Sequence, residues 1–64
     1  MTPSGYNGLC ELADERRWRV ELSMIAGLLR LVARDEAGVA LARPVRFDPR
    51  DRDACALRLM HRMR

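Results

Sequence analysis

The chain has 64 residues, two cysteines, one histidine and a net charge of +3 at neutral pH. A domain this short gains only about 3–5 kcal/mol of net stability from its own core, so it commonly depends on a disulfide, a structural metal or a partner subunit. Cys10, Cys55 and His61 are too few to complete a four-ligand zinc site, and they form no C-x-x-C pair. We therefore expect no metal and no cofactor, and the positive charge argues against a nucleic-acid mimic.

The start of the chain, Met1 to Gly5, has neither the basic nor the apolar region of a signal peptide. The longest nearly apolar run, Met24–Leu29, is too short to span a bilayer. We expect a cytoplasmic protein without membrane contact, with Cys10 and Cys55 as free thiols. A Cys10–Cys55 disulfide is the alternative and would add about 3–4 kcal/mol. If the thiols are free, partner subunits become the expected source of extra stability.

The first residues are rich in turn formers, so we expect 1–7 to be a flexible lead-in and 8–64 to form a single small domain. Asn7 is a suitable cap for a short helical turn that carries Leu9 and Leu12.

A long amphipathic helix is predicted over about residues 15–37, with Asp14 as its N-cap and Gly38 ending it. An apolar residue recurs every three or four positions along this stretch, at Trp18, Leu22, Ile25, Leu29 and Val32. A strand is the competing interpretation of residues 17–24, because apolar and polar residues also alternate there. We favour the helix because its apolar stripe continues beyond Met24, whereas the alternation ends at Ile25.

One strand is predicted over about residues 39–47, where Val39, Leu41, Val45 and Phe47 share one side. Pro44 confines it to an edge or to a position whose amide points at solvent. A C-terminal helix over about residues 49–63 follows, since Asp48 is a good N-cap and Pro49 suits the first helical position.

These elements predict a helix-dominated α+β domain that dimerises. The apolar arc of the long helix is wider than the remaining elements can cover, and a lone strand needs a neighbour, which a two-fold mate would supply. Two alternatives remain: the chain's own ends clamp the helix, or residues 17–24 are a strand, which gives a β-α-β-α order and weakens the dimer argument. The predicted interface comprises Trp18, Leu22, Ile25, Leu29, Val32, Leu41, Val45 and Phe47.

All twelve basic residues are arginine, and four of them, Arg16, Arg19, Arg30 and Arg34, fall on the polar side of the predicted long helix. This arginine ridge is either a solvated surface or a contact surface for carboxylates or phosphates, which arginine binds through two parallel hydrogen bonds.

No pattern of nucleophile, base and acid is present, and the four glycines form no phosphate-binding loop. We therefore expect a non-enzymatic regulator, inhibitor or adaptor that acts as a homodimer by binding another protein, of the kind common in phages and mobile elements. One alternative is a nucleic-acid-binding transcriptional regulator that uses the arginine ridge, and another is the small subunit of a larger enzyme.

Overall fold

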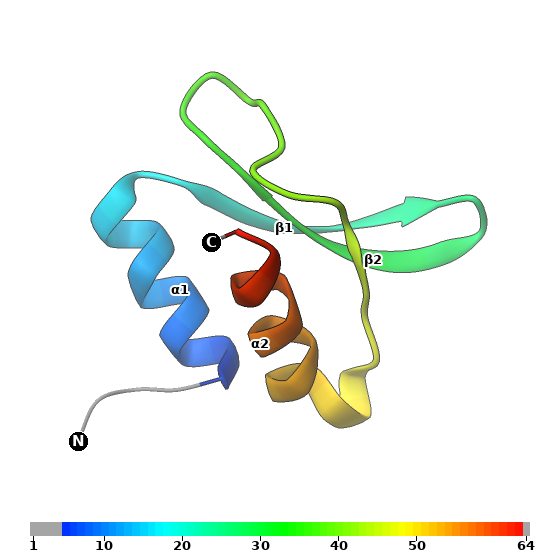
Figure 1. Cartoon of the computed structure of the whole chain (residues 1–64). Helices are drawn as coiled ribbons and strands as arrows, with labels where there is room; N and C mark the ends of the chain where they lie inside the picture. Colours follow the sequence, from blue (N-terminus) through cyan, green and yellow to red (C-terminus); the bar gives the residue numbers. More distant parts are fainter. Residues whose placement is uncertain (1–4, 64) are drawn as a thin grey trace.

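The computed structural model describes residues 5–63 and contains two helices and a three-stranded antiparallel sheet (Figure 1). The α+β class therefore agrees with expectation, although the arrangement does not. The elements are α1 (Gly5–Arg16), β1 (Arg19–Ile25), β2 (Leu28–Arg34), β3 (Val45–Arg46), a short 3-10 turn η1 (Pro49–Asp51) and α2 (Arg52–Arg62). The strands lie side by side in chain order.

Helix α1 buries one narrow stripe, formed by Leu9 and Ala13 one helical turn apart. It ends at Arg17, which adopts a positive φ of 59°. The amide of Trp18 donates to the Ala13 carbonyl (2.8 Å) and the amide of Arg17 to the Asp14 carbonyl (3.3 Å). This pair of bonds is the Schellman motif that satisfies the last carbonyls of a helix. Asp14 is therefore near the end of a helix rather than at the start of one.

A tight hairpin joins β1 to β2. The ladder pairs Arg19 with Arg34 at one end and Ile25 with Leu28 at the other, so Ala26 and Gly27 alone form the turn. Both turn residues have positive φ, 52° and 78°. Positive φ at both central positions is typical of the type I′ turn, whose twist matches that of the flanking strands.

Strand β3 pairs with β2, and the chain then enters the second helix as predicted. The Asp48 side chain accepts a hydrogen bond from the Arg50 amide (2.9 Å), and Pro49 occupies the first position of η1. Cys55, Ala56 and Leu59 form the buried side of α2.

The two helices run side by side in the same direction and cover one face of the sheet (Figure 1). Their N-termini are joined by a hydrogen bond from the Tyr6 amide to Asp53 Oδ1 (2.9 Å). Glycine suits position 5, because its φ of 63° is left-handed and a Cβ there would lie only 2.5 Å from the same oxygen, so Asp53 would have to shift. The core between the layers comprises Leu9, Leu31, Ala33, Val45, Cys55, Ala56 and Leu59.

Several predictions of element type were wrong. The long helix over 15–37 is the end of α1 followed by the β1–β2 hairpin, and the predicted single strand over 39–47 is mainly a loop that contributes only β3. Since β2 pairs with β1 on one side and β3 on the other, no lone strand within residues 5–63 requires a two-fold mate. The prediction of a dimer that pairs such a strand is therefore wrong.

Residues 5–7 of the predicted flexible lead-in belong to α1, and the rest of that segment lies outside the described residues. Cys10 is half-buried, Cys55 is buried, and both are free thiols. None of the helices described is long and apolar enough to cross a membrane.

The turn generates a first prediction. Ala26 adopts a left-handed conformation that costs an alanine about 1 kcal/mol, whereas asparagine tolerates it and Asn-Gly is a favoured type I′ pair. We expect Ala26→Asn to raise the free energy of unfolding by about 0.5–1 kcal/mol in urea denaturation. Ala37→Asn, at an exposed position with no positive φ, is the control and should leave stability nearly unchanged. A decrease of stability in Ala26→Asn would contradict the assigned turn.

Candidate functional site

The hairpin register divides the sheet into two faces, because alternate residues of a strand point to opposite sides. Val20 pairs with Ala33 and Leu22 with Leu31, so this set faces the helices, where Leu31 and Ala33 are buried. The opposite side, here called the outer face, carries the alternate positions of all three strands. These are Arg19, Glu21, Ser23 and Ile25 of β1, Leu28, Arg30, Val32 and Arg34 of β2, and Arg46 of β3.

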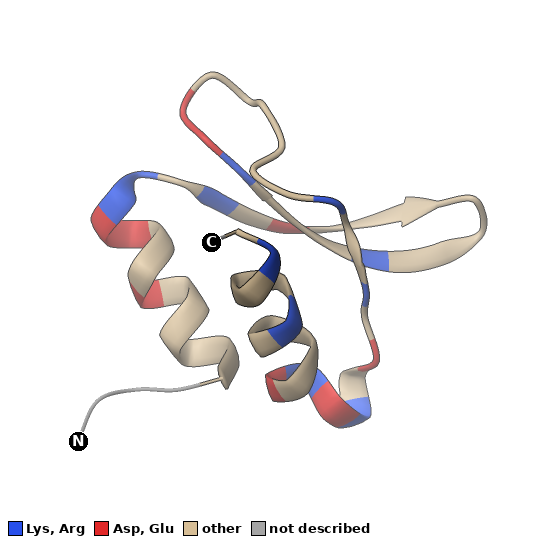
Figure 2. Cartoon of the chain, viewed as in Figure 1, with Lys and Arg blue, Asp and Glu red and all other residues tan. Residues whose placement is uncertain are grey.

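Arginines from all three strands gather on the outer face. Arg19 lies directly opposite Arg34, and Arg30 lies directly opposite Arg46. Basic residues are visible on each of these strands in Figure 2. Like charges at directly opposed positions of a sheet repel each other. The outer face is therefore a region of positive potential held by the backbone register.

Only part of this charge is neutralised inside the chain. Arg34 Nε contacts Glu21 Oε1 at 2.7 Å, and the same guanidinium donates to the Gly38 carbonyl. The other ion pair among residues 5–63, between Arg17 and Glu36 at 3.8 Å, lies at exposed positions away from the strand faces. Within the described part of the chain, no carboxylate forms an ion pair with Arg19, Arg30 or Arg46.

Val32 is buried on this face, with only 1% of its surface exposed, although both helices lie on the other side. Its neighbours on the outer face are Glu21 across the ladder and Arg30 and Arg34 along the strand. Arginine stems commonly cover apolar surface while the guanidinium remains in water. The position of Val32 thus favours extended arginine side chains whose charged ends point to solvent.

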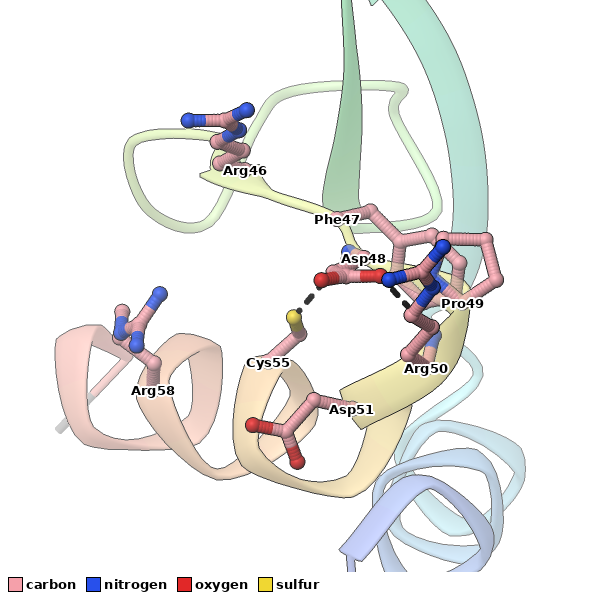
Figure 3. A pocket seen from close by; sticks show the side chains of 8 residues that line it. All are labelled: Arg46, Phe47, Asp48, Pro49, Arg50, Asp51, Cys55 and Arg58. Atoms are coloured by element: carbon pink, nitrogen blue, oxygen red, sulfur yellow. Dashed lines mark hydrogen bonds between the residues drawn. The ribbon is translucent and has the colours of Figure 1, made fainter.

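A pocket of about 620 Å³ adjoins the outer face at the free edge of β3. Figure 3 shows Arg46 of β3 and Arg58 of α2 on the same side of this pocket, with Pro49 and Arg50 across from them. The buried Cys55 thiol lies at its base, where Sγ accepts a hydrogen bond from the Asp48 amide (3.4 Å). Asp51 lines the pocket as well.

The charged groups of the outer face and the pocket are mainly guanidinium groups. Within residues 5–63, no three His, Cys, Asp or Glu side chains come together as a metal site would require. The Cys55 thiol is buried, and the pocket residues include no histidine. Guanidinium groups from three elements can instead bind phosphate or carboxylate oxygens.

Three of the four residues of the predicted arginine ridge come together, although on a sheet rather than a helix. Arg19, Arg30 and Arg34 share the outer face. Arg16 belongs to α1, where its guanidinium lies 5.6 Å from the centre of the Trp18 ring. The prediction that all four form one helical ridge was therefore wrong.

The eight residues predicted as an oligomer interface do not form one surface. Val32 and Val45 are buried on opposite faces of the sheet, and Trp18, Leu29, Leu41 and Phe47 are half-buried. Leu22 and Ile25 are exposed, but their side chains point to different faces of β1.

A separate apolar surface lies at the end of the hairpin farthest from α1. Leu22, Met24, Ile25 and Leu28 have 45%, 67%, 40% and 40% of their surfaces exposed. The first two lie on the helix side of the hairpin and the last two on its outer face, and we refer to these four residues together as the distal hairpin surface. It extends beyond the helices in Figure 1. Strand β1 is also an edge strand, so one side of its backbone has no neighbouring strand in the described chain.

Sequence reasoning missed Arg46 as a functional candidate. A signal for Arg46 existed, because it alternates with Val45 and Phe47 and so must point away from the side that buries them. No sequence signal places Arg58 beside Arg46, since this depends on how α2 packs against β3.

Comparison with known proteins identified no relative: no family model, no curated protein and no solved structure matches this chain.

The Glu21–Arg34 ion pair generates a second prediction. Both side chains are 36% exposed, so their coupling should be modest, about 0.5–1 kcal/mol, and weaker at high salt. A double-mutant cycle with Glu21→Gln and Arg34→Gln, followed by urea denaturation at low and high salt, measures it. A coupling energy of zero at low salt would contradict a formed ion pair on the outer face.

Proposed function

We propose that this protein is a non-enzymatic, cytoplasmic regulator that binds nucleic acid through the outer face of its sheet. The observation that carries the proposal is the placement of Arg19, Arg30 and Arg46 on that face without a carboxylate partner in the described chain. An unneutralised set of guanidinium groups on a rigid sheet is the feature that a polyanion requires.

This order of preference reverses the expectation from sequence, in which protein binding came first. The excess apolar surface of a long helix supported that expectation, and residues 19–34 form a hairpin instead. The hairpin keeps Arg19 and Arg30 on one face and adds Arg46 of β3 to them. The hairpin therefore removes the main argument for a helical protein interface. It also strengthens the argument for an anionic ligand.

A third prediction tests the proposal. Replacement of Arg30 or Arg46 by glutamine should weaken binding of mixed-sequence DNA or RNA, because each change removes one guanidinium–phosphate interaction. The slope of log K against log salt concentration should become shallower by about 0.7–0.9 for each arginine replaced. Gel-shift titrations at several salt concentrations measure both quantities.

Arg52→Gln is the matched control, because it removes the same charge from a different surface. The Arg52 guanidinium lies 5.8 Å from the centre of the Tyr6 ring, at the N-termini of the helices. Equal weakening in Arg52→Gln and Arg30→Gln would mean that net charge alone attracts nucleic acid. The absence of any shift with wild-type protein at low salt would overturn the proposal.

A protein partner is the second candidate, and the distal hairpin surface is the specific observation that favours it. Among the described residues, four of the six large apolar side chains that are exposed lie within residues 22–28. Clustered exposed apolar groups commonly mark a protein contact, whereas single ones do not. Homodimerisation, expected from the size of the chain, would place this surface between two copies.

The fourth prediction concerns this second candidate. If two copies associate through the distal hairpin surface, light scattering coupled to size-exclusion chromatography should give a dimer for wild-type protein and a monomer for Met24→Lys. Val39→Lys is the control, because Val39 is also exposed (60%) but lies outside that surface. A monomeric wild-type protein at micromolar concentration would contradict homodimerisation.

A further inference from the structure

We propose that the nucleic acid bound by this chain is a duplex, held by its phosphate backbone on an arginine track that runs from Arg30 through Arg46 to Arg58. The inference rests on the proposed function and specifies its ligand. The track crosses three elements: β2, the free edge of β3, and α2.

Continuity of the track follows from two independent observations. Arg30 and Arg46 are paired positions of neighbouring strands, which places their side chains next to each other on the outer face. Arg46 and Arg58 line the same side of one pocket (Figure 3). Arg46 therefore connects the sheet face to the helix. Among the described residues, none of the three arginines forms an ion pair.

Two acidic residues line the pocket beside the track. The Asp48 carboxylate is the cap of η1 and accepts a hydrogen bond from the Arg50 amide. Asp51 lines the pocket below Cys55 in Figure 3, on the side away from Arg46. A phosphate would be repelled from the base of the pocket. The backbone of the nucleic acid should therefore cross the pocket at its Arg46–Arg58 side.

Aromatic side chains are the main means by which proteins bind single strands, because unpaired bases stack on exposed rings. The chain has one each of Trp, Tyr and Phe. Tyr6 and Phe47 pack edge-to-face against each other, with ring centres 6.3 Å apart. The half-buried Trp18 ring has the Arg16 guanidinium 5.6 Å from its centre. Phe47 lines the pocket beside Arg46, but it is half-buried and packed against Tyr6, so the track offers guanidinium groups and no fully exposed ring on which a base could stack.

A surface of guanidinium groups without a fully exposed aromatic ring favours a duplex over a single strand. In a duplex the bases are already stacked inside, and the phosphates form a regular outer surface with one charge for about every 1.7 Å of helix axis. Guanidinium groups bind such phosphates through paired hydrogen bonds without reading the sequence. A flexible single strand would have to be ordered on the track without gain from stacking. We therefore expect binding that is strong for duplexes and independent of sequence.

The experiment is a fluorescence-anisotropy titration of the full chain against labelled DNA and RNA duplexes of about 20 base pairs and against each separate strand, between about 50 and 200 mM salt. We expect at least about tenfold tighter binding of one or both duplexes than of their strands, and a duplex slope of log K against log salt near −3, from three phosphate interactions at about −0.9 each. The two duplexes show whether the backbone is that of DNA or RNA.

Variants test the course of the track. Arg58→Gln should weaken duplex binding by about three- to tenfold and reduce the slope by about 0.9, because the glutamine amide forms no charge-assisted hydrogen bond with a phosphate. Arg50→Gln is the matched control, since Arg50 lines the opposite side of the same pocket. Both arginines are exposed, so circular dichroism should show both variants folded.

The outcomes separate the two proposals. Binding of no probe at low salt overturns the proposed function. Single strands bound as tightly as duplexes overturn the duplex inference but leave the proposed function intact. Unchanged duplex binding in folded Arg58→Gln, or an equal weakening in Arg50→Gln, overturns the track.

Discussion

The two-residue turn at Ala26 and Gly27 is the constraint on which the rest of the structure depends. It pairs Ile25 with Leu28, and every later pair of the ladder follows from that one. Because side chains alternate between faces, a shift of one residue would move Leu31 and Ala33 out of the core and place arginines against the helices. The turn therefore decides at once which residues stabilise the domain and which remain available to a ligand.

The two faces of the sheet differ in role because the helices cover only one of them. Two parallel helices supply Leu9, Ala56 and Leu59 to the covered side, and their N-termini are held together by the Tyr6–Asp53 hydrogen bond. Among the described residues, the outer face has no such layer. Its charged side chains can extend into solvent while their apolar stems stay on the sheet.

The C-terminal helix was predictable, because its signals are local. Asp48 and Pro49 indicate a helix start whatever surrounds them, and the structure has one there. The hairpin was not predictable in the same way. Strand β2 carries apolar residues on both faces, at Leu31 and Val32, so the apolar and polar residues of this strand do not alternate clearly. The apolar residues of this stretch also recur at the spacing of a helix, so a helix was predicted instead. The turn itself gave little warning, because Ala-Gly is a weak turn signal. The arginine cluster was partly predicted, but Arg58 reaches it only through tertiary packing.

The paired positions of Arg30 and Arg46 carry a cost that the rest of the described chain does not offset. Directly opposed like charges destabilise a sheet, and a carboxylate on either neighbouring position would remove the repulsion. Glu21 is instead bound to Arg34, farther along β2 from that pair. A phosphate between two guanidinium groups converts their repulsion into two attractions. The free protein thus retains electrostatic energy on its outer face that an anionic backbone would release.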